Sequence, residues 1–320
     1  MRAHRGVRDH VVMLVGGVGG AKLAVGLADL LPPEALTIIV NTGDDFEHLG
    51  LHISPDLDTV MYSLAGLANP VTGWGVADDT FRAMDMVKRC NGPGWFQLGD
   101  LDLGTNLMRT MMLRKGLTLT QVTQHLCACL GVRHPLLPMC NDMVQTWLDT
   151  DQGTLAFQEY FVRERWQPVV KQVRFVGADK AQLSPEVAAA LEGATLILFG
   201  PSNPFLSIDP ILAVTGIYER ILTSSAVRIA VSPIVGGRAI KGPAAKLMAE
   251  LGLDVSPRGI AEHYRELLDG LVLDVVDQDW CGEIEQLGIQ PVALHTLMNT
   301  LSDKVRLAEA TLAWAEEILP

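Results

Sequence analysis

Residues 11–22, VVMLVGGVGGAK, bring glycines and a lysine together in a pattern suited to binding phosphate. The apolar run at 11–15 predicts a strand, and the apolar periodicity after Lys22 predicts a helix. The loop between them contains the four glycines Gly16, Gly17, Gly19 and Gly20. A glycine backbone can approach a phosphate closely, and free N–H groups at a helix start point at it. We expect Lys22 to add positive charge; a tight turn without a ligand is the alternative.

Neither of the two common nucleotide-binding patterns fits this loop. The dinucleotide fingerprint G-x-G-x-x-G can begin at Gly17, but Lys22 then stands in place of its third glycine. The P-loop pattern can begin at Gly16, but Ala21 replaces its second glycine and Leu23 replaces its magnesium-binding hydroxyl. The loop therefore predicts a phosphate ligand without fixing the class of that ligand.

Carboxylates follow the next predicted strand, residues 36–40. Asp44 and Asp45 come directly after it, and the carboxyl ends of strands are where ligands bind in open α/β sheets. Such a pair could bind a ribose hydroxyl or hold Mg²⁺, and a solvated turn is the bland alternative. Asp56 and Asp58 open a helix after Ser54 and Pro55, where acidic residues also favour the helix dipole. Because these two are two residues apart, we expect at most one to share a site with Asp45.

Two later loops also follow predicted strands and contain small or polar residues. The first follows the strand at 195–199 and contains Gly200, Ser202 and Asn203. The second follows the strand at 227–231 and contains Ser232, Gly236 and Gly237, with Arg238 and Lys241 just beyond. This second loop repeats the order of the first one, namely strand, glycines, cation and helix.

The elements that must position these residues predict an α/β fold. The length allows one large α/β domain over residues 1–320 or two small ones. Residues 77–150 lack clear parallel-strand runs and predict a mainly helical insertion. Residues 153–161 and 169–176 predict strands, 270–276 a last strand, and 302–318 a terminal helix.

Composition narrows the classes of partner. The 320-residue chain has a net charge of −12 and no cluster of basic residues, which argues against nucleic acid or an anionic membrane. Its five cysteines show no zinc-type spacing, so we expect them to be reduced in a cytoplasmic protein. The basic N-terminus precedes an apolar run that glycines interrupt at once, so we do not expect a signal peptide. The sequence leaves the oligomeric state open, a homodimer included.

The loops taken together resemble one family, the 2-phospho-L-lactate transferases of coenzyme F(420) biosynthesis. Eight motifs carry the resemblance in order, from about residue 11 to residue 277: GGVGGAK at 16–22, NTGDD at 41–45, ISPDLDT at 53–59, GWG with DDTF at 73–81, LGDLDLGT at 98–105, LPM at 137–139, GPSNP at 200–204 and SPIVGG…KGPAAKLM at 232–248.

The resemblance implies a single Rossmann-like α/β domain, with a mostly parallel sheet, helices on both faces and a mainly helical insertion. It also implies an activity and a set of roles. The donor would be a guanosine diphosphate-linked hydroxyacid, and the acceptor would be the deazaflavin Fo, whose terminal ribityl hydroxyl attacks phosphorus and releases GMP. Mg²⁺ would be held by Asp45 and Asp58, and together with Lys22 these would be the catalytic residues; one of the two aspartates is alternatively the base. The glycines at 16–20 and the loops GPSNP and SPIVGG would hold the nucleotide. The residues assigned to substrate binding are Asp56, Thr59, Trp74 and Asp100. Trp74 would face the deazaflavin or else belong to the core.

The chain departs from the family's commoner patterns at two places. LGDLDLGTN replaces a frequent Arg at Leu101 and a frequent Ala-Thr-His at residues 104–106, and residues 140–143 also differ. These changes leave open whether the donor carries lactate, enolpyruvate or glycerate. Two rival functions are a non-enzymatic regulator that binds nucleotide sugars and a nicotinamide oxidoreductase, the latter disfavoured by Lys22.

Overall fold

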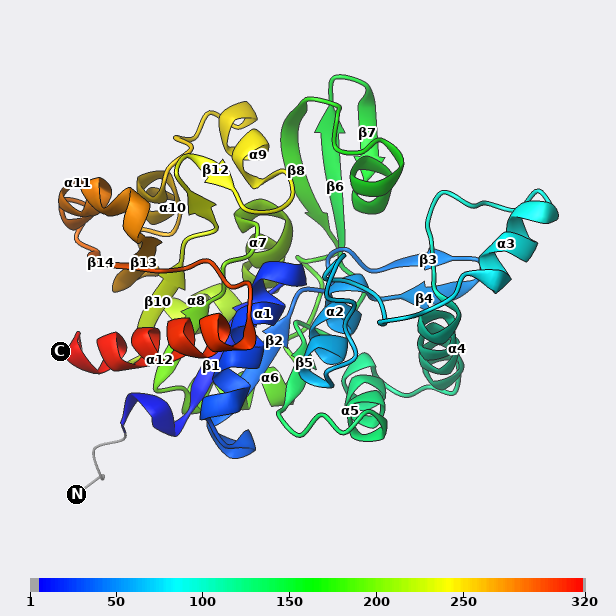
Figure 1. Cartoon of the computed structure of the whole chain (residues 1–320), viewed down its shortest axis with the longest axis horizontal. Coiled ribbons are helices and arrows are strands. Elements are labelled where there is room, and N and C mark those ends of the chain that lie inside the picture. The colour runs from blue at the N-terminus through cyan, green and yellow to red at the C-terminus, as the bar shows by residue number, and fades with distance from the viewer. Residues whose placement is uncertain (1–5, 319–320) are drawn as a thin grey trace.

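A seven-stranded parallel sheet organises the chain (Figure 1). The computed structural model describes residues 6–318. The strand order is β14-β13-β10-β9-β1-β2-β5, and every neighbouring pair is parallel. The sheet strands are β1 Val11–Val15, β2 Leu36–Val40, β5 Leu136–Pro138, β9 Leu196–Phe199, β10 Val227–Val231, β13 Gly270–Asp274 and β14 Gln290–Leu294.

The remaining elements cover or extend this sheet. The α-helices are α1 Gly17–Leu30, α2 Pro55–Leu64, α3 Arg82–Arg89, α4 Asp100–Arg114, α5 Leu119–Cys129, α6 Pro185–Gly193, α7 Asp209–Leu212, α8 Ile217–Leu222, α9 Ala244–Glu250, α10 Pro257–His263, α11 Cys281–Glu285 and α12 Leu301–Glu317. The short 3-10 and π helices are η1 Val7–Asp9, η2 Pro33–Ala35, η3 Glu159–Arg163, η4 Pro204–Ile208 and η5 Val275–Trp280. The smaller strands are β3 Phe46–His48, β4 Leu51–Ile53, β6 Gln145–Thr150, β7 Gly153–Ala156, β8 Val170–Val176, β11 Ile234–Val235 and β12 Arg238–Ala239.

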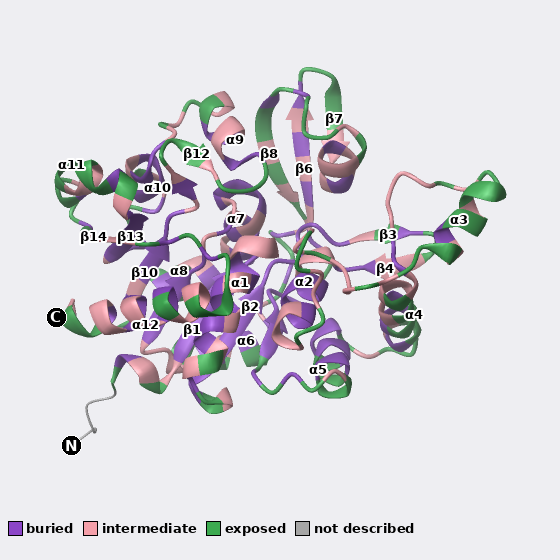
Figure 2. Cartoon of the chain, viewed as in Figure 1, coloured by how far each residue is buried: buried purple, intermediate pink, exposed green. Residues whose placement is uncertain are grey.

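Two hydrophobic cores lie on opposite faces of the sheet. Side chains alternate along β1. Val12 and Leu14 therefore belong to one core, and the other core contains Val11, Met13 and Val15. Helices α1, α2, α5 and α12 cover one face, and α6, α7, α8 and α10 cover the other. Strands buried on both faces read as continuous apolar runs, which is why residues 11–15 and 36–40 were recognisable (Figure 2). The predicted fold class is thereby confirmed.

The direction in which successive strands are added to the sheet changes between β1 and β9. From β1 the chain builds outward through β2 to β5, and after a long excursion it returns to the other side of β1 and builds β9, β10, β13 and β14. The loops that leave β1 and β9 therefore diverge at the carboxyl edge of the sheet. In open α/β folds this topological switch point is where ligands bind.

The predicted helical segment at 77–150 ends earlier than expected. It contains α3, α4 and α5, but β5 lies inside it and pairs in parallel with β2, with Ile38 opposite Leu136. β6 also begins at Gln145 and forms an antiparallel sheet with β7 and β8. A strand of three residues that contains a proline has no periodicity to recognise, so β5 was missed. The predicted strand at 153–161 is similarly shortened to β7, followed by η3.

The five cysteines, Cys90, Cys127, Cys129, Cys140 and Cys281, are free thiols in the structure. Among residues 6–318, no helix combines the length and apolar character needed to cross a bilayer.

Candidate functional site

A cavity of about 690 Å³ opens at the carboxyl edge of the sheet, at the switch point between β1 and β9. The loop after β1, the start of α2 and the loop after β9 form its polar part. Pro233 from the loop after β10 and Met298, which precedes α12, also line it. The cavity therefore collects side chains from segments spread over most of the chain.

The first glycine loop forms the start of α1 rather than an open loop. Gly16 is the N-cap, and its N–H donates to Ser202 Oγ at 3.1 Å, which joins the loop after β1 to the loop after β9. The N–H of Gly17 donates to Asp56 Oδ1 at 2.6 Å. A Cβ at Gly19 would overlap the carbonyl oxygen of Pro201, so only glycine allows the two loops to lie this close.

Four aspartates form the acidic side of the site. Asn41, itself fully buried, donates to Asp44 at 3.3 Å and to Asp56 at 2.9 Å. Asp45 Oδ2 accepts from Ser54 Oγ at 2.7 Å and lies 3.0 Å from His52 Nε2, whereas its Oδ1 is buried without a hydrogen-bond partner. The hydroxyl of Ser54 therefore donates to Asp45. Ser54 occupies the N-cap position of α2, but its side chain makes no capping hydrogen bond to the helix.

Asp58, the fourth aspartate, is held by a buried arginine. Arg109 on α4 is 1% exposed, and its guanidinium donates to both carboxylate oxygens of Asp58. Arg109 also donates to Asn106 Oδ1, and Asn106 donates to Asp102. Asp102 accepts from the hydroxyl of Tyr62 at 2.9 Å. This network links the starts of α2 and α4 on one side of the cavity.

The carboxylates crowd one another, and their pKa values rise accordingly. Burial, followed by the charges of Asp56 and Asp45, holds the pKa of Asp44 well above its usual range. Burial raises the pKa of Asp56 to about 6, although hydrogen bonds from Asn41 and Gly17 oppose the shift. Burial and the charge of Asp58 raise the pKa of Asp102 to about 7. A site that resists ionisation in this way is suited to a cation or to proton exchange near neutrality.

Two lysines lie on the other side of the glycine loop. Lys22 and Lys241 both line the cavity. Lys22 Nζ donates to the carbonyl of Met298 at 2.8 Å, and its pKa is lowered by burial and by the charge of Lys241. Lys241 Nζ donates to the carbonyl of Thr72 at 3.0 Å. Two cations beside a helix N-terminus provide the positive potential that a diphosphate requires.

Aromatic side chains line the rest of the cavity, and we call this part of its lining the aromatic wall. They come from three separate segments and are Trp74, Trp95, Phe96, Phe157, Phe161 and Trp166. Phe157 and Phe161 are stacked, with ring centroids 5.4 Å apart and planes inclined by 13°. Trp74 is 48% exposed, so it lines the cavity and is not a core residue. Flat apolar surfaces of this kind suit a planar ring system.

Comparison with known proteins places this chain in a family. Residues 11–312 match the family model described as 2-phospho-L-lactate transferase CofD. The chain belongs to the CofD family. The family predicted from eight motifs is thus confirmed, and with it the transferase class.

Full-length relatives of this CofD-family protein carry two names. The chain is 41% identical to a phosphoenolpyruvate transferase of Streptomyces griseus over 96% of this chain and 99% of that protein. It is 40% identical to a 2-phospho-L-lactate transferase of Methanococcoides burtonii over 91% and 94% of the two chains. A solved UPF0052-family structure from Bacillus halodurans shares the fold, with a TM-score of 0.63 at 18% identity over 97% and 100% of the two chains.

Many of the residues predicted for the site do line the cavity of the CofD-family protein. They are Gly16, Gly17, Gly19, Lys22, Asp56, Asp58, Thr59, Trp74, Ser202, Asn203 and Ser232. At most one of Asp56 and Asp58 is predicted to share a site with Asp45. Both of them line this cavity, because it surrounds the first turn of α2. Asp45 is buried behind the lining, within electrostatic reach of Asp56 and Asp58.

Asp100, predicted to bind substrate, instead stabilises a helix start. Its carboxylate accepts from the Thr80 hydroxyl and from the N–H groups of Arg82 and Ala83, at the start of α3. Asp79 does the same for α4, accepting from the N–H groups of Leu101 and Asp102. The two aspartates thus cap each other's helices, and Asp100 is not among the residues that line the cavity.

The remaining predicted glycines also lie outside the lining. Gly20 and Gly200 pack against β1, where a Cβ would come within 3.0 Å of Val15 side-chain atoms. Gly236 and Gly237 have φ angles of 56° and 69° and form the two-residue turn of the β11–β12 hairpin. The N–H of Gly236 donates to Asp277 Oδ2 at 2.9 Å. This loop contributes Ser232 and Pro233 to the cavity, but not its glycines.

The carboxylate cluster fits Mg²⁺ as a cation that takes few protein ligands. In residues 6–318 no group of three His, Cys, Asp or Glu side chains forms a complete metal site. Mg²⁺, however, commonly uses one or two carboxylates together with water and substrate phosphates. The Oδ1 atom of Asp45 has no hydrogen-bond partner and is a candidate ligand atom, and Arg109 forms the ion pair with Asp58. The carboxylates at this site outnumber the cations that pair with them, and this excess of negative charge is the observation that fits Mg²⁺.

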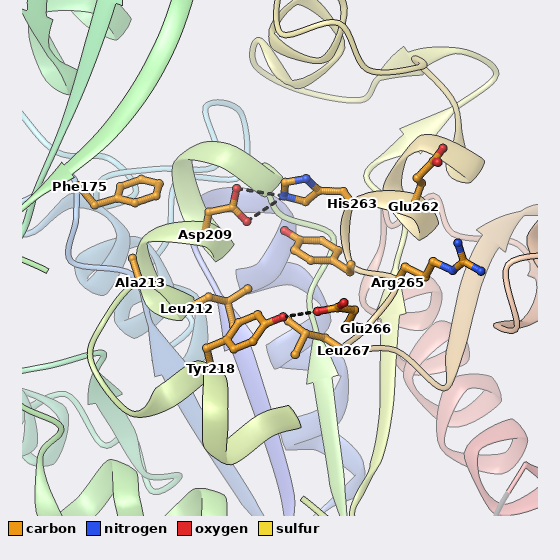
Figure 3. Close-up of a pocket in the computed structure, with 11 residues that line it drawn as sticks. Phe175, Asp209, Leu212, Ala213, Tyr218, Glu262, His263, Arg265, Glu266 and Leu267 are labelled. Atoms are coloured by element: carbon orange, nitrogen blue, oxygen red, sulfur yellow. Dashed lines mark hydrogen bonds and ion pairs between the residues drawn. The ribbon is translucent and has the colours of Figure 1, made fainter. Parts of the chain in front are cut away.

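A second cavity, of about 580 Å³, lies between α7, α8 and α10 (Figure 3). At its floor His263 Nε2 is 3.0 Å from both carboxylate oxygens of Asp209, and the hydroxyl of Tyr218 donates to Glu266 at 3.0 Å. Burial raises the pKa of Asp209, and the hydrogen bond with His263 opposes the rise. This cavity contains none of the residues predicted for the site.

Several residues of the site were missed by sequence reasoning. Arg109 stands in an apolar stretch, LMRTMML, where no local pattern distinguishes a buried arginine from a surface one. Asp102 belongs to the motif LGDLDLGT at 98–105, but the sequence did not predict a role for it. Trp95 and Phe96 follow a Gly-Pro-Gly turn, and that turn was a usable signal for an aromatic loop.

Proposed function

We propose that this protein transfers a phospho-hydroxyacid from a GDP-linked donor to the terminal ribityl hydroxyl of the deazaflavin Fo. One observation carries the proposal: a single cavity joins a helix N-terminus with two lysines, a carboxylate cluster and an aromatic wall. These are the features that a nucleoside diphosphate, a metal-assisted phosphoryl transfer and a planar acceptor require. The names of the full-length relatives support the same substrate class.

The residues divide between donor and acceptor. We assign the diphosphate to the start of α1, Lys22 and Lys241, and the nucleotide to the loop that contains Ser202 and Asn203. The acceptor ring is assigned to the aromatic wall, with Trp74 and Trp95 as contacts. The acceptor oxygen forms a bond to the phosphorus next to the hydroxyacid, the bond from that phosphorus to the bridging oxygen of GMP breaks, and GMP leaves with the electron pair.

The hydroxyl proton needs an acceptor in the cavity. Asp102 lies at the start of α4, close in sequence to the aromatic residues Trp95 and Phe96, and its pKa of about 7 allows it to take a proton near neutrality. Asp58 is less suited because both of its carboxylate oxygens accept from Arg109. We therefore assign the proton to Asp102, with Tyr62 and Asn106 orienting its carboxylate.

We also propose that Mg²⁺ is bound through Asp45 and Asp58, with Arg109 fixing the carboxylate of Asp58. When bound, the cation would supply charge neutralisation for the transferring phosphoryl group. The test is Mn²⁺ binding to the protein, followed by electron paramagnetic resonance. We expect Asp45→Asn and Asp58→Asn each to weaken binding about tenfold or more, while Asp277→Asn leaves it unchanged. Unaltered Mn²⁺ affinity in both variants would remove these aspartates from the metal site.

The activity itself is tested by mass spectrometry. Purified protein is mixed with Mg²⁺, Fo and three guanylated donors, the lactyl, enolpyruvyl and phosphoglyceryl forms. A phosphodiester of Fo together with GMP would establish the transfer and identify the hydroxyacid. If none of the donors gives product and Fo does not bind, while a UDP-sugar binds tightly, the protein is instead a nucleotide-sugar-binding regulator.

A further inference from the structure

A loop that carries an aromatic residue of the cavity lies against the phosphate side of the same cavity. This loop, residues 69–76, contains Trp74, and we call it the Trp74 loop. Lys241 Nζ donates to the carbonyl oxygen of Thr72 in this loop at 3.0 Å. A Cβ at Gly73 would lie 2.7 Å from a side-chain methyl group of Val18 and 3.1 Å from Lys241 Nζ. The Trp74 loop therefore contacts both the start of α1 and Lys241, which we assign to the donor diphosphate.

Hydrogen bonds within the Trp74 loop hold its residues together. The carbonyl oxygen of Asn69 accepts from the N–H of Gly73 at 2.8 Å, and the N–H of Asn69 donates to the carbonyl of Gly75 at 3.0 Å. The hydroxyl of Thr72 donates to the carbonyl of Trp74 at 2.7 Å. A contact on the carbonyl of Thr72 therefore also acts on the position of Trp74, two residues further along the same braced loop.

Lys241 has the donors to contact a phosphate and the Trp74 loop at the same time. Its side chain lines the cavity, and a lysine ammonium has three N–H groups, of which the bond to Thr72 uses one. Burial, followed by the charges of Lys241 and Lys304, lowers the pKa of Lys22, so the two cavity lysines repel each other. A diphosphate beside them relieves this repulsion and holds the ammonium of Lys241 through charge-assisted hydrogen bonds.

We propose that Lys241 couples the two substrates: its ammonium, held by the donor diphosphate, fixes the Trp74 loop in the position that receives the acceptor ring. This inference rests on the proposed function, which places the diphosphate at Lys241 and the planar ring at Trp74. Without a donor, the exposed side chain of Lys241 keeps its rotamer freedom, and acceptor binding must order it together with the loop. A bound donor has already ordered both. The donor therefore raises the affinity for the acceptor, and the acceptor raises the affinity for the donor by the same factor.

The test is isothermal titration calorimetry on the full chain with Mg²⁺, Fo and GDP, which has the diphosphate but no hydroxyacid to transfer. We expect saturating GDP to lower the dissociation constant of Fo about tenfold in the wild type, and Lys241→Met to remove this effect. The matched control is Lys22→Met. Lys22 Nζ donates to the carbonyl of Met298 and not to the Trp74 loop, so this variant should bind GDP more weakly but keep the tenfold effect once GDP is saturating.

Two glycines of the Trp74 loop provide a second test that leaves both lysines in place. Gly73 and Gly75 have φ angles of 78° and 71°, so alanine is strained to a similar degree at either position. A Cβ at Gly73 would press on Val18 and Lys241, whereas a Cβ at Gly75 meets no atom within 4 Å. We expect Gly73→Ala to reduce the effect of GDP on Fo binding from about tenfold to about twofold or less, and Gly75→Ala to keep it.

The outcomes separate this inference from the proposed function. If GDP and Fo both bind the wild type but neither changes the affinity for the other, the coupling is absent and the proposed function stands. A GDP effect that persists in Lys241→Met, or that is equal in Gly73→Ala and Gly75→Ala, would also overturn the role of Lys241. If GDP or Fo does not bind the wild type even when the other is present, the proposed function fails and the inference fails with it.

Discussion

The two glycine loops of this protein have the same order in sequence but different structures. Residues 16–20 and residues 236–237 each follow a buried strand and precede a cation, and in each loop one N–H donates to one aspartate. In the first loop Gly16 is extended and forms the N-cap of α1, and Gly17, Gly19 and Gly20 belong to the beginning of this helix. In the second, positive φ angles turn the chain back into a hairpin. The first loop therefore places the start of a helix at the cavity, and the second loop does not.

The difference lies in what surrounds each loop. The first lies at the switch point, where it contacts Pro201 and Ser202 of the loop after β9 and where Asp56 lies within hydrogen-bond distance. The second is attached to β10, farther along the sheet, and its aspartate, Asp277, follows β13. A glycine pattern acquires a ligand role from its place in the sheet as well as from its own residues.

The largest effect is expected for a methyl group added to the first loop. Gly19→Ala should lower transferase activity more than 100-fold and cost about 2 kcal/mol of stability, because the new Cβ overlaps the carbonyl oxygen of Pro201. Gly237→Ala should cost about 1 kcal/mol through its positive φ and keep activity within about threefold. Steady-state kinetics and thermal unfolding of both variants measure the difference. Equal losses of activity would show that the second loop also serves the site.

The two aspartates that accept from these loops sharpen the comparison. Asp56→Asn should reduce kcat/KM by about 10- to 100-fold, since it removes a charge beside the carboxylate cluster and places an amide N–H₂ against Asn41. Asp277→Asn keeps a side-chain oxygen that can accept from the N–H of Gly236, and Asp277 does not line the cavity. The activity of this variant should therefore stay within about threefold of the wild type. Measuring kcat/KM for both variants tests which loop serves the site. If Asp277→Asn lowers kcat/KM and Asp56→Asn does not, the second loop and not the first one serves the site.

The cations that follow the loops should differ less strongly. Lys22→Met is expected to raise the KM for the guanylated donor about tenfold with a smaller change in kcat. The reason is that the substitution removes the positive charge of Lys22, which attracts the diphosphate of the donor. Arg238→Met, after the second loop, should leave KM unchanged because Arg238 does not line the cavity. Donor titrations at low and high salt provide the measurement. A salt-independent KM for the wild type would contradict this role of Lys22.

The smallest effect concerns stability against pH. Because the folded-state pKa of Asp56 is raised to about 6, the folded protein binds more protons than the unfolded chain between about pH 4 and 6. This contribution is therefore fully present below about pH 4 and is lost as pH rises through 6; we expect it to be on the order of 1 kcal/mol. Melting temperatures without divalent cations should fall over this range. The fall should be smaller in Asp56→Asn than in Asp277→Asn, and identical profiles would exclude Asp56 as its source.

The sequence alone determined five of the seven strands of the sheet, the first loop and the family. Strands buried on both faces are continuous apolar runs, so β1, β2, β9, β10 and β13 could be located without a structure. The glycines and Lys22 predicted a phosphate site from local chemistry, since glycine conformation and helix-end N–H groups are local properties. Eight ordered motifs then identified the family.

Only the tertiary structure decided which of these residues meet. The pairing of Asp58 with Arg109 joins residues 51 positions apart, and no local pattern marks a buried arginine. Asp100 became a helix cap because Thr80 lies next to it, and residues 236–237 became a hairpin because β12 pairs with β11. Hydrogen bonds and burial between distant segments depend on topology, whereas sequence patterns report only the conformation of neighbours along the chain. The aromatic wall, built from three separate segments, is the clearest case of a feature that exists only after folding.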